Sequence, residues 1–262
     1  MIHPIKSLEA RHQNYLSGHF AKSKYGKAIA ALKGIHNGES CFIIGNGPSL
    51  RAEDLTILKN NNVITFGANR IYNMFGKTDW RPTYYACEDE FICEDIKDKI
   101  EEFPIKYKFI PIQLNWYKNI KLNSVTYYNS KVPTSDEKAS DDMAEFSILN
   151  GTVTGFFIQM AVYMEFKNIY LIGVDHNFSR MTDKNGNLIV DNNVKDHFGN
   201  QKNADENTKG IYNIDYATQT YIDLKRFCDK KGVKVFNATR GGKLEVYPRV
   251  DFDSLFNKEE QK

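Results

Sequence analysis

The feature that most constrains the fold is an apolar run that stops on a glycine-rich turn. Residues Cys41–Ile44 are all of a type usually buried, and the turn Gly45-Asn46-Gly47-Pro48-Ser49 follows them. This pattern predicts a central β-strand leading into a loop, with Ser49 placed to cap and open the next helix. Glycines in such a loop let backbone N–H groups approach a phosphate closely. The pattern favours a nucleotide site here, while an ordinary strand–turn–helix corner is the plain alternative.

The turn matches neither of the two common nucleotide-binding loops. Pro48 and Ser49 break the Gly-x-Gly-x-x-Gly spacing of dinucleotide-binding folds, and no Gly-Lys-Ser/Thr of a P-loop follows. A nucleotide bound at this turn is therefore expected to be held in a different way.

Composition limits the class of protein. The chain has 262 residues, of which 41% are apolar and 26% charged, and its formal net charge is +2. These values are typical of one large α/β domain with an insertion, or of two small domains. Because the charges are interspersed rather than clustered, we expect no nucleic-acid partner.

Cysteine spacing and hydropathy indicate a cytoplasmic protein. The four cysteines are too scattered for a zinc signature, so reduced thiols and no structural metal are expected. The N-terminus lacks the apolar core of a signal peptide, and no apolar stretch reaches the roughly 18 residues of a membrane span. We expect a soluble protein, with any membrane contact peripheral and at the inner face of the cell membrane.

Apolar runs alternate with helical patterns along most of the chain. Strands are expected at residues 62–67, 83–87, 108–112, 124–128, 168–174 and 233–236, and helices at 155–164 and 214–231. Continuous apolar strands that alternate with helices predict a Rossmann-like α/β fold, a mostly parallel sheet with helices on both faces.

Two segments differ from this pattern. Residues 1–35 are Lys-rich with apolar side chains at helical intervals, which predicts an N-terminal helical region packed on a domain formed by residues 36–262. This region could instead rest on a membrane surface or contact a second copy of the chain. Residues 176–213 are polar, and we expect them to form a lid that orders over a ligand.

Polar side chains collect where the predicted strands end. Asn46, Asn69 and Asp175 each follow such a strand. Because the carboxyl ends of parallel strands meet at one edge of a sheet, these groups should lie together, where amides can contact a base and a carboxylate can accept from ribose hydroxyls. Thr152 and Thr154 precede an apolar helix, whose N-terminus can hold phosphate.

Four motifs together resemble a known family. They are Phe42–Leu50, Phe66–Arg70, Ile169–Asp175 and Asn237–Glu245. They look like the bacterial 6-hydroxymethylpterin diphosphokinase-like family, which is common in surface-polysaccharide gene clusters and related to motility-associated flagellin glycosyltransferases. More distantly, the order of motifs is similar to the family 42 sialyltransferases, which are Rossmann-like enzymes with a lid that bind a CMP-sugar and need no metal or other cofactor.

The resemblance to the sialyltransferases implies roles for individual residues. Asn69 would contact the CMP moiety, Thr154 and Gly155 would reach the nucleotide from the helix N-terminus, and Asp175 would lie near the ribose. The full set implied or suggested for substrate and nucleotide binding is Gly45, Asn46, Gly47, Ser49, Asn69, Arg70, Thr152, Thr154, Gly155, Asp175 and Tyr212.

The catalytic base is where the match to the sialyltransferases is weakest. Those enzymes hold the leaving phosphate with lid tyrosines and take the acceptor proton with a His just before the late helix. Tyr212 matches one such tyrosine, but Asp215 stands roughly where the His would be. His197 is the first candidate, because a His beside a carboxylate can titrate near the operating pH, and Asp215 and His176 are the others. A solvated loop histidine is the plain alternative for His197.

These observations favour one function and leave two alternatives open. The favoured function is an inverting, metal-independent glycosyltransferase of surface-glycan synthesis. It would move an acidic sugar, a sialic acid-like nonulosonate or Kdo, from CMP to a hydroxyl of a glycan or glycolipid acceptor.

A 6-hydroxymethylpterin diphosphokinase is the alternative, since Glu88-Asp89-Glu90 could hold the Mg²⁺ of ATP. A solvated acidic turn is the commoner meaning of such a run. The third possibility is a non-catalytic nucleotide-sugar-binding protein. The oligomeric state stays open, with a homo-oligomer as one option.

Overall fold

A seven-stranded parallel sheet forms the centre of the computed structural model, which describes residues 12–183, 185–198 and 211–257. The strand order is β12-β8-β1-β2-β3-β4-β5, and all neighbours pair in parallel. The strands are β1 (Ser40–Ile44), β2 (Ile64–Ala68), β3 (Tyr84–Ala86), β4 (Tyr107–Pro111), β5 (Thr126–Tyr128), β8 (Asn168–Ile172) and β12 (Lys234–Asn237). The predicted Rossmann-like α/β class is confirmed, and each expected strand is present.

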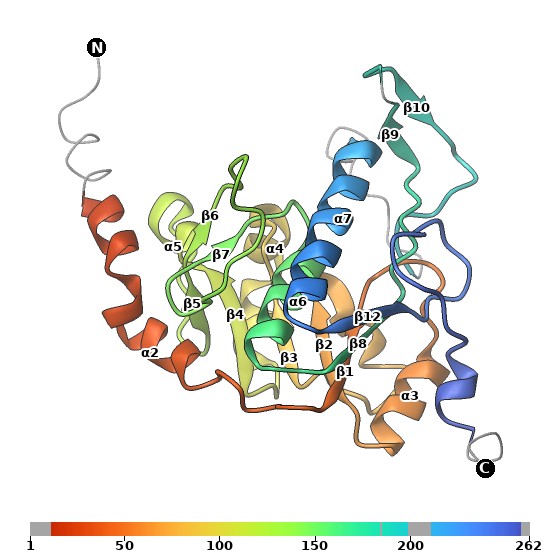
Figure 1. The fold of residues 1–262 in the computed structure, drawn as a ribbon, viewed down its shortest axis with the longest axis horizontal. Coiled ribbons are helices and arrows are strands. Elements are labelled where there is room, and N and C mark those ends of the chain that lie inside the picture. Colours follow the sequence, from red (N-terminus) through yellow and green to blue (C-terminus); the bar gives the residue numbers. More distant parts are fainter. Residues whose placement is uncertain (1–11, 184, 199–210, 258–262) are drawn as a thin grey trace.

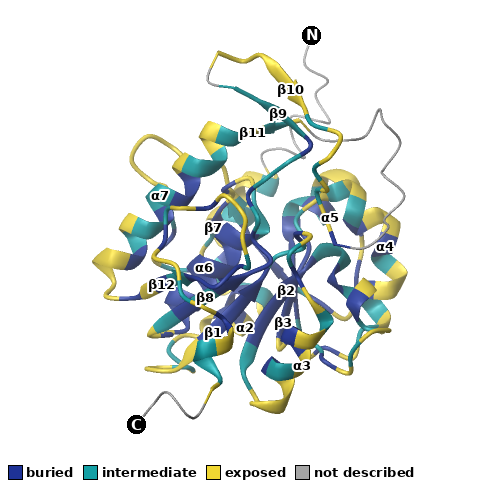
Figure 2. Ribbon diagram, turned by 90° about the vertical axis from the view of Figure 1, so that its right-hand side faces the viewer, coloured by how far each residue is buried: buried dark blue, intermediate teal, exposed yellow. Residues whose placement is uncertain are grey.

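Helices cover both faces of the sheet, because its central strands are apolar on both sides. They are α2 (Lys24–Ala30), α3 (Ala52–Asn60), α4 (Glu90–Glu102), α5 (Ile112–Lys118), α6 (Val153–Tyr163) and α7 (Ile214–Lys230). Helices α6 and α7 pack together on one face, and α3 and α4 lie on the other (Figure 2). Within the described ranges, no helix combines the length and the hydropathy that crossing a bilayer would require.

The order of the strands predicts a ligand-binding crevice beside β1. From β1 the chain runs outward through β2, β3 and β4 to β5, and it then returns through α6 to β8 on the other side of β1. The sheet therefore changes its winding direction between β1 and β8. In open α/β sheets ligands bind at such a point, outside the carboxyl ends of the strands.

A second, smaller sheet forms within residues 176–213. It contains β9 (Arg180–Thr182), β10 (Leu188–Val190) and β11 (Tyr212–Asn213) in the order β10-β9-β11. Figure 1 shows β9 and β10 projecting beyond the central sheet, near the N-terminal end of α7. Residues 199–210 of the expected lid lie outside the described residues, and closure of this segment over a ligand stays a prediction.

The N-terminal helical region packs on the central sheet. Helix α2 follows η1 (Phe20–Lys22) and contacts β5, and Phe20, Ile29 and Leu32 are buried in the common hydrophobic core. The ring of Tyr25 meets that of Tyr127 edge to face at 5.2 Å.

Two local predictions were wrong, both because the partner of a side chain is distant in sequence. Helix α3 begins at Ala52 with no side-chain cap, since the Ser49 hydroxyl donates to Asp175 instead. Residues 113–150 also contain more structure than expected, namely α5 and the paired strands β6 (Ser130–Lys131) and β7 (Ser147–Ile148). The buried side chain of Gln159 on α6 fixes β7 by bonding both the N–H and the carbonyl of Ile148.

Candidate functional site

The glycine turn after β1 lies against the end of β8. The N–H of Gly45 donates to the carbonyl of Ile172, and the N–H of Gly47 donates to that of Gly173, each at 2.8 Å. A Cβ on Gly45 would lie 2.3 Å from the Gly173 oxygen, and one on Gly47 would lie 1.8 Å from a carboxylate oxygen of Asp175. Glycine is therefore needed at 45 and 47 so that the two strand ends can approach each other.

This packing engages several of the N–H groups that the sequence suggested for phosphate. The N–H groups of Gly45 and Gly47 already donate to β8, and that of Leu50 donates to the carbonyl of Gly47. Ser49 is also engaged, because its hydroxyl donates to Asp175 at 2.7 Å. The N–H groups of Gly45 and Gly47 thus serve the packing of the two strand ends, and the contact of the turn with a phosphate stays a prediction.

Asp175 is fixed by segments from both ends of the chain. Its carboxylate accepts from Ser49, and its backbone carbonyl accepts from the N–H of Lys243 at 2.7 Å. Gly242 packs so closely that a Cβ there would lie 2.8 Å from the Asp175 carbonyl oxygen. Burial raises the pKa of Asp175, and its bonds with Ser49 oppose that shift. The C-terminal motif of the resemblance therefore has a clear structural task, which is to hold Asp175 at the crevice.

Two asparagine side chains follow the neighbouring strands β1 and β2. The amide nitrogen of Asn46 donates to the Ala68 carbonyl at 3.0 Å, which leaves its Oδ1 buried without a hydrogen-bond partner among the described residues. Asn69 has a left-handed backbone (φ 52°), and its Oδ1 is likewise buried and unpartnered in the described part of the chain. Buried polar atoms are normally hydrogen-bonded, so two such acceptors at adjacent strand ends mark a place where a donor-bearing ligand can bind.

His197 lies at the same end of β1. The backbone carbonyl of Asn46 accepts from the Phe198 N–H at 2.9 Å, and the His197 ring lies near that carbonyl. Although the residue is exposed as a whole, desolvation by neighbouring atoms lowers the pKa of His197, and the charge of Arg70 lowers it further while Asp196 opposes the shift. Arg70 itself is paired with Asp95 at 2.8 Å. The structure thus brings together predicted residues that lie about 150 positions apart in the sequence.

The other two candidate bases, His176 and Asp215, lie elsewhere and share one pocket. This pocket has a volume of about 480 Å³ and is bounded by the first turn of α7, the small sheet and the C-terminal turn. It is lined by His176, Asn177, Met181, Asp183, Ile189, Ile214, Asp215, Thr218 and Lys243. Because His176 directly follows Asp175, the pocket adjoins the crevice.

The hydrogen bonds of His176 indicate which ring nitrogen carries the proton. Its Nε2 lies 2.9 Å from the Thr218 hydroxyl, and that hydroxyl donates to the Ile214 carbonyl at 2.8 Å. With the hydroxyl proton committed, Nε2 must donate, and Nδ1 of the neutral ring keeps its lone pair. The ring is buried, which lowers the pKa of His176, and the backbone is left-handed (φ 50°). Such backbone conformations are concentrated at functional sites.

The N-terminus of α6 is covered by α7. Thr152 caps the helix by accepting from the N–H of Thr154, and Thr154 is itself buried. The hydroxyl of Tyr221 on α7 lies near both threonine side chains, which lower the pKa of Tyr221 against the effect of its burial. Gly155 is required because a Cβ there would lie 2.8 Å from Cβ of Asn150. The expected contact of this helix end with a nucleotide stays a prediction.

Tyr212 belongs to β11 of the small sheet. Its ring stacks on Phe178 with centroids 3.9 Å apart and planes inclined by 14°. Burial raises the pKa of Tyr212, and the nearby Asp196 and Asp89 raise it further. The stack joins β11 to the segment that leads from β8 into the small sheet.

The three carboxylates of Glu88-Asp89-Glu90 have separate partners. Asp89 caps α4, Glu90 pairs with Lys118 at 2.8 Å, and Glu88 accepts from the Tyr128 hydroxyl at 2.6 Å. Over residues 12–183, 185–198 and 211–257, no three Asp, Glu, His or Cys side chains converge as a metal-binding group. The acidic run therefore does not fit a preformed magnesium site.

Two arginines of the C-terminal region, Arg240 and Arg249, are engaged by carboxylates. Arg240 forms bonds with both Asp54 and Asp253. Arg249 pairs with Glu245 and donates to carbonyls of the turn around Gly241. The sequence carries no local signal for the pairing of Arg240 with Asp54, since the two residues lie 186 positions apart.

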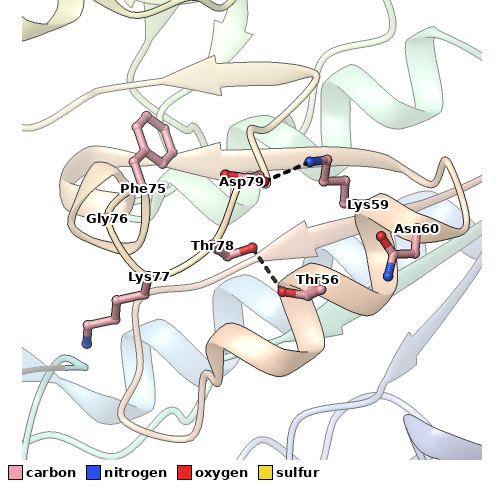
Figure 3. Close-up of a pocket in the computed structure, with 8 residues that line it drawn as sticks. All are labelled: Thr56, Lys59, Asn60, Phe75, Gly76, Lys77, Thr78 and Asp79. Atoms are coloured by element: carbon pink, nitrogen blue, oxygen red, sulfur yellow. Dashed lines mark hydrogen bonds and ion pairs between the residues drawn. The ribbon is translucent and has the colours of Figure 1, made fainter.

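A second hollow lies at the other end of the strands. Figure 3 shows it between the C-terminal half of α3 and the loop before β3, with a volume of about 380 Å³. Its hydroxyl and charged groups pair with each other, Thr56 with Thr78 and Lys59 with Asp79. It contains none of the groups gathered at the crevice.

Comparison with known proteins identifies the family. The model of one family, described as 6-hydroxymethylpterin diphosphokinase MptE-like, matches residues 17–181, which is more than half of the chain. A search of curated proteins found no match. That family name is of a phosphoryl-transfer enzyme, so the kinship is with enzymes of transferase type. The protein belongs to the 6-hydroxymethylpterin diphosphokinase MptE-like family.

Proposed function

We propose that the protein is a glycosyltransferase of surface-glycan synthesis whose donor is a CMP-activated acidic sugar, a nonulosonate or Kdo. One observation carries this proposal. The side-chain oxygens of Asn46 and Asn69 are buried at the ends of adjacent strands and have no hydrogen-bond partner within residues 12–183, 185–198 and 211–257, and they lie on the same edge of the sheet as Asp175. No cofactor or metal takes part in the proposed reaction.

The chemistry of these groups suits a nucleoside better than a polyphosphate. All three present acceptor oxygens, which repel phosphate and bind amino and hydroxyl donors. Cytosine carries one exocyclic amino group, and ribose carries two hydroxyls. A single phosphate, as in CMP, also needs fewer cationic side chains than a triphosphate does. This matters because Arg240 and Arg249 already pair with carboxylates.

The reaction divides between the crevice and the adjoining pocket. The acceptor oxygen attacks the anomeric carbon, the bond from that carbon to the phosphate oxygen breaks, and CMP departs with inversion. We place the base at His176, whose Nδ1 keeps its lone pair in the neutral ring, with His197 and Asp215 as the alternatives to be tested. The contribution of the protein is then positioning of the reactants and proton transfer.

The test is binding and turnover of CMP-sugars. We expect CMP-sialic acid or CMP-Kdo to bind and to be turned over equally with and without EDTA. Asn46→Ala and Asn69→Ala should each weaken CMP binding about tenfold, the loss of one hydrogen bond to a buried group. Asn60→Ala, at the hollow of Figure 3, is the matched control. Absence of binding by both CMP-sugars would refute the proposal.

A diphosphokinase is the second candidate, because the family is described by that activity. It predicts AMP formation from ATP and 6-hydroxymethylpterin that stops when magnesium is removed. Binding of a CMP-sugar without turnover, unchanged in His176→Gln and His197→Ala, would instead indicate a non-catalytic nucleotide-sugar-binding protein.

A further inference from the structure

Glu88 is a titratable group at the carboxyl edge of the sheet that the proposed reaction does not use. It stands two residues beyond Ala86, which pairs with Ala68 of β2. Asn69 directly follows Ala68, and neighbouring strands lie about 4.8 Å apart, so Glu88 stands beside the end of β2 that carries Asn69. The Tyr85 hydroxyl ties the two strand ends together by donating to the Asn69 carbonyl at 2.8 Å. Glu88 therefore borders the place proposed for the nucleoside.

The side chain of Glu88 lies on the face of the sheet that α6 covers. Its Oε1 accepts from the Tyr128 hydroxyl at 2.6 Å, and the ring of Tyr128 stacks on Phe156 with centroids 4.2 Å apart. Phe156 is the fourth residue of α6. One aromatic ring thus separates the carboxyl from the first turn of the helix that was expected to contact the nucleotide.

The carboxyl of Glu88 has no cationic partner in the described part of the chain. The titratable groups around it are Tyr128 on β5, Cys93 on α4, and its own neighbours Cys87 and Asp89, none of which can carry a positive charge. Desolvation raises the pKa of Glu88 to about 7, and the bond from Tyr128 opposes that shift. Below pH 7 most of the carboxyl is therefore protonated, and it can then donate a hydrogen bond.

One oxygen of this carboxyl is open to a ligand. Oε1 is engaged by Tyr128, but Glu88 is partly exposed, and no residue within 12–183, 185–198 and 211–257 bonds to its Oε2. Arg70, the cation next to Asn69 in the sequence, is already paired with Asp95. A neutral donor beside the nucleoside can supply the hydrogen bond that a free cation would otherwise give.

We propose that Glu88, in its protonated form, donates a hydrogen bond to the phosphate of CMP, and that its ionised form repels the same phosphate. The acid form gives a charge-assisted bond to an anionic oxygen, whereas two anions at this distance disfavour binding. This inference rests on the proposed function, because it concerns the phosphate of the same CMP.

The experiment measures CMP affinity by titration calorimetry at pH 6 and pH 8, in the wild type and in Glu88→Gln. Glutamine keeps the shape of the side chain and offers an amide donor at both pH values. With its pKa at about 7, only about one tenth of Glu88 is protonated at pH 8, so CMP should bind to the wild type about tenfold more weakly than to Glu88→Gln. At pH 6 the two proteins should bind CMP alike. The ratio of the two affinities cancels the titration of the phosphate itself, whose second pKa is about 6.

Three controls assign the effect to this carboxyl and to the phosphate. Cytidine, which lacks the phosphate, should bind equally to both proteins at both pH values. Glu94→Gln, the same substitution on the exposed surface of α4, should follow the wild type. Tyr128→Phe removes the bond that lowers the pKa of Glu88, so its loss of CMP affinity should begin at a higher pH. Urea denaturation of each variant checks that it is folded.

The outcomes separate this inference from the proposed function. If CMP binds but the ratio of wild type to Glu88→Gln is the same at pH 6 and pH 8, the inference is overturned and the proposed function stands. An equal pH effect on cytidine would also overturn it, because Glu88 would then act on the nucleoside. Absence of CMP binding in all the proteins would refute the proposed function and this inference together.

Discussion

Gly47 and Asp175, which lie 128 positions apart, are packed so that no side chain fits between them. A Cβ on Gly47 would lie 1.8 Å from Oδ2 of Asp175. The same oxygen accepts the hydroxyl of Ser49 at 2.7 Å, so the carboxylate is clamped against the turn after β1. This contact sets where the carboxylate stands in the crevice.

Gly47→Ala should therefore move Asp175 and damage the crevice. We expect a loss of about 1–3 kcal/mol in the free energy of unfolding, the usual cost of overpacking, measured by urea denaturation. Affinity for CMP should fall at least about tenfold, because the carboxylate is displaced. Gly76→Ala is the control, as a Cβ at Gly76 meets nothing within 4 Å and should change stability by less than about 0.5 kcal/mol. Unchanged CMP binding in Gly47→Ala would show that the position of Asp175 does not matter.

Glu88 should make stability fall as pH rises. Burial raises the pKa of Glu88 from 4.5 to about 7, with the Tyr128 hydroxyl opposing the shift. Below pH 4.5 the carboxyl is protonated in both states, and between pH 4.5 and 7 only the unfolded chain gives up this proton. The free energy of unfolding thus falls by up to about 3 kcal/mol as the pH rises across this window. In urea denaturation at pH 5 and pH 8, the stability of Glu88→Gln should not show this fall with pH. The variant should therefore be more stable than the wild type at pH 8. Glu94→Gln, on the surface of α4, should keep the wild-type slope.

His176 should set the acid limb of the pH profile. Because burial lowers its pKa from 6.5, the neutral, active form of the base persists below that pH, and kcat/KM should decline only at more acid values. His176→Gln should lower kcat by about a hundredfold or more. Thr218→Val removes the acceptor of Nε2–H, so we expect a smaller loss of kcat together with a shifted acid limb. Should His197→Ala abolish the acid limb while His176→Gln preserves it, the base is His197.

Arg240 should be needed for stability rather than for substrate binding. It pairs with Asp54, which is 4% exposed, and removing it leaves that carboxylate buried and unpaired. Arg240→Met should therefore cost about 3 kcal/mol in urea denaturation, with CMP affinity unchanged in the folded protein. Arg226→Met is a suitable control, because Arg226 also pairs with an aspartate but is 69% exposed and should cost less than about 1 kcal/mol.

The sequence by itself determined the sheet and the list of groups at its edge. Strands such as β1 and β8 are continuous apolar runs, since both of their faces are buried, and that signal is local. The positions of Asn46, Asn69 and Asp175 after such strands follow from the same pattern, so their gathering at one edge was predictable.

Only the tertiary structure decided what those groups contact. Ser49 reads as a helix cap but bonds Asp175, 126 positions away, and the glycines of the turn make room for a carboxylate rather than a phosphate. Glu88 reads as part of a solvated acidic turn but is only partly exposed and accepts from the Tyr128 hydroxyl. In each case a contact distant in sequence overrides the local preference, because burial and a strong hydrogen bond outweigh the propensity of a single turn.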